Sequence, residues 1–167
     1  YSGLGRISDT ASVGLVATGL NDNDERVVAA AMMALNRFGD RGLSYIMEWL
    51  PRDENSIESR GEKLLTLAIE LMGDSKFNKA RPIIENIFRF GKRLNPQAAA
   101  VKTLLQLGAP LSLIDEVLID WQYWQKVKLA EGLAFIDHEA GRARLTPLLN
   151  DPVALVRAVL AELNETD

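Results

Sequence analysis

The chain has few residues with the chemistry that catalysis requires. Its 167 residues include a single histidine, His138, and no cysteine, which excludes thiol catalysis, a disulfide and a metal site built on two histidines. The sequence also lacks the Gly-x-Ser-x-Gly turn of serine hydrolases and the Gly-x-x-x-x-Gly-Lys loop that binds phosphates. We therefore predict no catalytic residue, no metal ion and no cofactor, and we expect that the protein is not an enzyme.

One acidic run has the composition of a calcium-binding loop. It reads Asp22-Asn23-Asp24-Glu25, but the glycine and the distal glutamate of such a loop are absent at their offsets. Asp and Asn are also the residues that most often cap the first turn of a helix. We predict a helix cap here and not a metal site.

Aromatic side chains gather at Trp121-Gln122-Tyr123-Trp124, which holds two of the three tryptophans. Trp and Tyr anchor protein partners because they bury a large area at low entropic cost and keep a polar group. They also fill cores. On a helix, positions 121 and 124 share a face and 123 points elsewhere, so we expect that all three are not buried together. A surface anchor and a core position both stay open for each residue.

Charge is unevenly distributed along the chain. There are 19 Lys and Arg against 23 Asp and Glu, for a formal net charge of −4, so we do not expect nucleic acid as a partner. Residues 76–93 are the exception, with one acidic side chain and six basic ones: Lys76, Lys79, Arg81, Arg89, Lys92 and Arg93. This basic block is either a patch for an acidic protein or phosphates, or a solvated outer helix, which we favour. We place the intervening Phe77, Phe88 and Phe90 in the core.

The elements that would position these side chains are helices. Glycine closes an apolar stretch at Gly39, Gly73 and Gly108, which are 34 and 35 residues apart, and glycine suits the left-handed residue that follows a helix. A second series of apolar landmarks repeats at 30 to 35 residues: Leu20, Leu50, Ile84, Ile119 and Leu149. No segment alternates apolar and polar residues as a strand would. We predict ten helices, near residues 10–20, 24–38, 41–50, 56–72, 76–90, 96–107, 111–120, 122–136, 138–149 and 151–164.

Local signals define several helix starts. Asn95-Pro96 and Asp151-Pro152 each place a capping side chain before a proline, which we expect at the first helical position. Pro82 and Pro147 should each start or kink a helix. The longest uninterrupted apolar run, residues 27–35, is too short to cross a membrane, so we expect no membrane span.

The segment Leu149-Asn-Asp-Pro-Val-Ala-Leu-Val-Arg-Ala158 resembles the turn and second helix of a HEAT repeat, of the short bacterial, armadillo-like kind. Residues 20–34 resemble a second copy. The resemblance implies that the second helices of successive hairpins line a concave surface that grips another protein. It places Arg60, Lys102, Lys128 and Arg157 on that surface, beside the aromatic anchors Trp121, Tyr123 and Trp124. For Arg157 an alternative is a bridge between repeats through Asp151 or Asp137.

Hairpins of about 30 to 35 residues must stack to bury their apolar faces. We therefore expect an all-α fold, a right-handed α-α superhelix (solenoid) of about five stacked hairpins. Residues 1–167 would form a single domain, which we expect to be part of a longer polypeptide because the sequence begins Tyr-Ser-Gly without Met.

The predicted function is a non-catalytic scaffold that binds a protein or peptide on its concave face. The alternative is a HEAT-like enzyme, such as a DNA glycosylase or a bilin lyase, with a pocket formed by Trp121, Trp124, Asp115 and Asp120. Sequence leaves the oligomeric state and the compartment open, with the cytoplasm favoured.

Overall fold

The computed structural model describes residues 11–91, 93–110, 112, 126–127, 150–154, 156–158 and 161. Within these residues every regular element is a helix and there is no strand, which confirms the all-α prediction. Residues 11–18 are helical. The elements that follow are η1 (Gly19–Asn21), α2 (Glu25–Asn36), α3 (Asp40–Trp49), α4 (Glu54–Ser59), α5 (Glu62–Asp74), η2 (Asn78–Ala80), α6 (Arg81–Phe90) and α7 (Leu94–Gln106).

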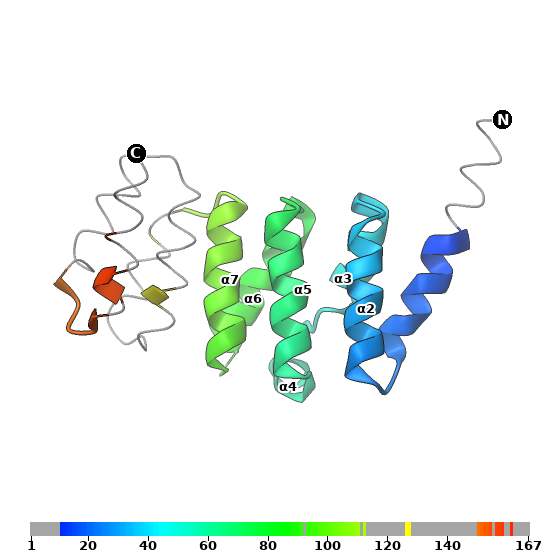
Figure 1. Cartoon of the computed structure of the whole chain (residues 1–167), viewed down its shortest axis with the longest axis horizontal. Helices are drawn as coiled ribbons and strands as arrows, with labels where there is room; N and C mark the ends of the chain where they lie inside the picture. Colours follow the sequence, from blue (N-terminus) through cyan, green and yellow to red (C-terminus); the bar gives the residue numbers. More distant parts are fainter. Residues whose placement is uncertain are drawn as a thin grey trace.

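The helices form two layers. Figure 1 shows α2, α5 and α7 side by side in chain order, with α3 and α6 behind them. Helix α5 packs on both α2 and α7, while α3 packs on α2 and α6 packs on α7. Between the layers lies one continuous apolar core, whose fully buried side chains include Met32, Leu35, Ile46, Leu65, Ile69, Ile84 and Leu104. None of the helices in the described residues is long and apolar enough to span a membrane.

The helix predicted over residues 56–72 is wrong, because two helices occupy this stretch. Helix α4 ends at Ser59, Arg60 has extended backbone, and α5 begins at Glu62. The apolar spacing nevertheless continues across the break, since Ile57 and Leu64 are both buried. The core therefore continues across the break, while the chain changes direction between α4 and α5. Of the predicted helices 111–120 and 122–136 the structure describes only residues 112, 126 and 127, which are helical, and 138–149 lies outside the described residues. Of 151–164 it describes 151–154, 156–158 and 161, and the first helical residue among them is Ala154.

Two of the three predicted left-handed glycines are confirmed. Gly39, between α2 and α3, has φ of 61°, and Gly108, just beyond the end of α7, has φ of 74°. The prediction for Gly73 is wrong, because Gly73 lies inside α5 and the left-handed residue is Lys76, with φ of 52°.

Helix α5 ends in a Schellman motif centred on Lys76. The backbone N–H of Phe77 donates to the carbonyl oxygen of Met72, and that of Lys76 donates to Gly73, both at 2.9 Å. Helix α7 makes the same two bonds, with Gly108 in the place of Lys76. The structural repeat from α5 to α7 is therefore 32 residues, and the spacing of 35 between the two glycines is not the repeat.

Gly73 is small for a different reason. A Cβ atom at this position would lie 2.7 Å from Thr103 Oγ1 and closer still to Gln106 Oε1. Thr103 is fully buried, and its hydroxyl donates to the carbonyl oxygen of Ile69 at 3.1 Å. Gly73 thus allows the close approach of α5 and α7.

Helix capping follows the sequence signals with one exception. Asp24 caps α2, with its carboxylate accepting from the N–H of Arg26 at 2.9 Å, as predicted for the acidic run. Pro82 lies in the first turn of α6, also as predicted. The exception is Asn95, because α7 begins at Leu94, two residues before the predicted start at Pro96, and the Asn95 side chain bonds to Glu62 instead.

Candidate functional site

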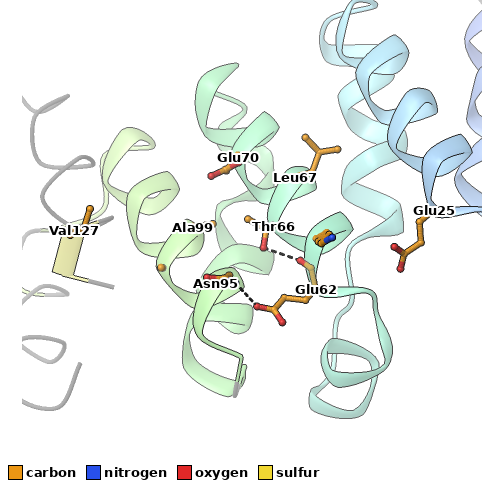
Figure 2. Close-up of a pocket in the computed structure, with 10 residues that line it drawn as sticks. Glu25, Glu62, Thr66, Leu67, Glu70, Asn95, Ala99 and Val127 are labelled. Atoms are coloured by element: carbon orange, nitrogen blue, oxygen red, sulfur yellow. Dashed lines mark hydrogen bonds between the residues drawn. The ribbon is translucent and has the colours of Figure 1, made fainter. Parts of the chain in front are cut away.

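A groove of about 730 Å³ runs along α5 on the layer formed by α2, α5 and α7. Figure 2 shows its lining, in which α5 is central, α2 contributes one carboxylate and α7 closes the other side. The lining residues are Glu25, Glu62, Lys63, Thr66, Leu67, Glu70, Asn95, Ala98, Ala99 and Val127.

The polar wall of the groove is one face of α5. Glu62, Thr66 and Glu70 are four residues apart, so the 3.6-residue turn of the helix brings them onto the same side. The Thr66 hydroxyl donates back to the carbonyl oxygen of Glu62 at 2.9 Å. Asn95 reaches across from α7 and donates from Nδ2 to Glu62 Oε1 at 2.7 Å. This bond fixes the carboxylate and ties the two helices together at the groove.

The apolar part of the groove comes from small side chains of α7 and from Leu67. Ala98 and Ala99 are both buried, while Leu67 and Val127 are partly exposed. Alanines at two successive positions leave a shallow depression between helices that larger side chains would fill. A bound segment could therefore bury an aliphatic side chain there while its polar groups meet the glutamates.

The electrostatics of the groove are acidic. Three carboxylates face a single ammonium, that of Lys63. Glu25 and Glu62 are the first residues of α2 and α5, where the positive end of the helix dipole stabilises a negative charge. In the described part of the chain no group of histidine, cysteine and carboxylate side chains could hold a metal ion. The lining offers hydrogen bonds, charge and apolar contact to a bound group.

The predicted contact residues do not lie together in the described structure. Trp121, Tyr123, Trp124 and Lys128 are outside the described residues, as are Asp115 and Asp120 of the enzyme hypothesis. Lys102 lies on α7, half-buried, and does not line the groove.

Arg60 has a structural contact instead of a place in the groove. Its guanidinium lies 4.5 Å from the centre of the Trp49 ring, a distance typical of cation–π stacking. The indole N–H of Trp49 in turn donates to the carbonyl oxygen of Leu20 at 3.0 Å. Arg60 thus covers a buried tryptophan that ties α3 to η1.

Arg157 makes only local hydrogen bonds in the described residues. Its Nη1 donates to the carbonyl oxygens of Asp151 and Pro152, at 2.6 and 3.1 Å. The bridge expected through the Asp151 carboxylate is made by Lys126, whose ammonium lies 2.6 Å from Asp151 Oδ2. Asp151 also accepts from the N–H of Val153 at 2.9 Å, but the helical residues begin at Ala154, so the predicted place of Pro152 at the first helical position is wrong.

The Asp151 side chain is only 3% exposed. Burial by itself would raise the pKa of this carboxyl, but the hydrogen bonds from Lys126 and Val153 and the nearby positive charges outweigh burial and lower the pKa. The pair is therefore an ionised, hydrogen-bonded link between residues 126 and 151.

The basic block is neither one patch nor a uniformly solvated face. Arg93 turns inward and donates to the carbonyl oxygens of Glu58 and Arg60, which caps the end of α4, and it forms an ion pair with the Glu58 carboxylate at 3.4 Å. Arg81 pairs with Glu85 at 2.9 Å, and Lys79 lies 5.8 Å from the Phe77 ring. Lys92 is outside the described residues.

Two of the three phenylalanines near the block are in the core. Phe77 and Phe88 are buried, as predicted. Phe90 is 51% exposed, so its predicted core position is wrong; it is the last residue of α6, where the helix leaves the core.

Sequence analysis missed the glutamates of the groove. The spacing of Glu62, Thr66 and Glu70 is visible in the sequence, and it places three polar side chains on one face of a helix. Glu25 was treated only as part of a cap.

Comparison with known proteins does not add a family to these observations. No protein-family model matches the chain, and no curated protein is significantly similar to it in sequence.

Proposed function

We propose that this chain is a non-catalytic scaffold that binds a protein or peptide segment in the groove along α5. In this proposal the described helices belong to a right-handed α-α superhelix of about five stacked hairpins, of the HEAT-repeat kind. Helices α2, α5 and α7 line its concave face. The observation that carries the proposal is a groove that spans three consecutive helices of one layer and combines charged, hydrogen-bonding and apolar side chains.

Long-range hydrogen bonds support the stacking of repeats. Asn86 donates to the carbonyl oxygen of Arg52, Asn95 to Glu62 and Thr103 to Ile69, over separations of 34, 33 and 34 residues. Bonds between positions one repeat apart are what a stack of similar hairpins produces, because each unit contacts mainly its neighbours. The two Schellman motifs are 32 residues apart, which is close to these separations.

Site-specific photo-crosslinking tests the binding surface. A photoreactive amino acid replaces Lys63, which is exposed at the rim of the groove, or Glu48, which is exposed on α3 in the other layer. We expect a crosslinked partner from position 63 and none from position 48 when the chain is incubated with extract of its source cells. Crosslinking from position 48 alone, or equally from both, would contradict the proposal.

A further inference from the structure

We infer that the segment bound in the groove is basic and aliphatic: a peptide that carries Lys or Arg next to a Val, Ile or Leu side chain. This inference rests on the proposed function and names the class of partner. It reverses the expectation from sequence, in which basic residues of the chain itself faced the partner.

The charge of the groove favours a basic occupant. Glu25 and Glu62, at the first turns of α2 and α5, outnumber Lys63, the one cation among the lining residues. Complementary charge steers association and excludes acidic competitors, which would place like charges side by side. Because the groove is partly enclosed, carboxylates within it interact with a bound cation more strongly than carboxylates on an open surface.

The first two glutamates are placed to accept hydrogen bonds from such a cation. Glu62 is held by Asn95 through Oε1, and no bond in the described part of the chain uses Oε2. Within the same residues neither Glu25 nor Glu62 forms an ion pair. A guanidinium or ammonium bound between α2 and α5 would donate a charge-assisted hydrogen bond to an oriented carboxylate.

The apolar contact provides the second part of the recognition. Leu67 lies one turn beyond Lys63, and the buried Ala98 and Ala99 leave room opposite it. An aliphatic side chain of the bound segment can pack against Leu67 there, while the basic side chain points toward the first turns of α2 and α5. The sequence of the partner should therefore combine both side chains within a few residues.

Fluorescence anisotropy with labelled peptide pools tests this inference on the 167-residue chain. The basic pool is an eight-residue peptide with random positions drawn from Lys, Arg, Leu, Val and Ala. The acidic pool has Glu and Asp in place of Lys and Arg, and the neutral pool has Gln and Ser. Three variants accompany the wild-type chain. Glu25→Gln and Glu62→Gln remove charges of the groove, and Glu48→Gln removes the same charge from α3 as a control.

We expect the basic pool to bind more tightly than the other two, and its affinity to fall as salt is added. Glu25→Gln and Glu62→Gln should each weaken binding by about three- to tenfold, as for partly exposed ion pairs. Glu48→Gln should leave the affinity unchanged. If all three Gln variants weaken binding equally, the attraction is one of net charge, and the inference is wrong.

A fourth variant separates the inference from the proposed function. Leu67→Arg fills the groove and should abolish binding of any peptide seated there, with circular dichroism confirming that the helices are retained. If the neutral or acidic pool binds as tightly as the basic pool and Leu67→Arg abolishes that binding, the groove is the site and the basic partner is wrong. If no pool binds, both proposals fail.

Discussion

At the contact between α2 and α3, we expect a glycine-to-alanine substitution to destabilise the protein, although helix propensity alone would predict a more stable variant. Gly42 is the third residue of α3 and is buried. Replacing a helical glycine by alanine normally stabilises a protein by about 0.5–1 kcal/mol. At Gly42, however, the new Cβ would lie 2.6 Å from the carbonyl carbon of Leu35 and closer still to its oxygen. Both atoms belong to the backbone of α2, which cannot rotate away as a side chain could.

Gly42→Ala must therefore push α2 and α3 apart. Overpacking of this kind costs about 1–3 kcal/mol and exceeds the gain in helix propensity, so we expect a net loss of about 1–2 kcal/mol. For a chain of this size the melting temperature would fall by about 2–8 °C.

Gly14→Ala is the matched control. Gly14 is also helical, but the nearest atom to its added Cβ is the Tyr45 hydroxyl oxygen at 3.9 Å, which is ordinary contact. We expect Gly14→Ala to be more stable than the wild-type chain by up to about 1 kcal/mol. Urea denaturation followed by circular dichroism measures both variants. If Gly42→Ala were as stable as Gly14→Ala, the described packing of α2 on α3 would be refuted.

Three further perturbations follow from individual contacts. Lys76→Gly should stabilise the chain by about 0.5–1 kcal/mol in urea denaturation, because Lys76 has left-handed backbone, which glycine adopts at lower cost. Gly108 has the same conformation at the equivalent end of α7. A destabilised variant would refute the Schellman assignment. Arg93→Ala should reduce the free energy of unfolding by about 1–2 kcal/mol, since two carbonyl oxygens at the end of α4 lose their donor. Arg93→Lys should restore only part of the lost stability, because lysine cannot donate to both oxygens in the same geometry. Full rescue by lysine would argue against a bidentate contact. The lowered pKa of Asp151 predicts a pH dependence: its ionised form contributes stability above the unfolded-state pKa of about 3.9, and that contribution is lost as pH falls through the lower folded-state pKa. Asp151→Asn should therefore be less stable than the wild-type chain at neutral pH, with the difference shrinking below about pH 4; a difference that stays constant from pH 7 to about pH 2 would contradict the ion pair with Lys126.

Local sequence signals predicted local structure well. The cap at Asp24, the start of α6 at Pro82 and the left-handed turns at Gly39 and Gly108 each depend on one or two residues and their nearest backbone groups. Such preferences act within a single turn, so they can be predicted from the sequence without knowledge of the fold.

Features that depend on contacts between helices could not be predicted from the local sequence. Gly73 looked like the end of a helix, but its size serves the approach of α7, and a lysine occupies the turn. Arg60 was assigned to a partner because the resemblance to HEAT repeats places it on the concave surface, whereas its guanidinium stacks on Trp49 of a neighbouring helix. The glutamates of the groove were missed because their importance depends on which face of α5 meets α2 and α7.

The most direct test of the account is to map where a peptide binds. Backbone amide NMR spectra of the isotopically labelled chain, recorded during titration with a tight-binding member of the basic peptide pool, report the affected residues. The account predicts that shifts concentrate on α2, α5 and α7, with Thr66 and Leu67 among the largest. Shifts concentrated on α3 and α6, with the amides of α5 unmoved, would contradict it.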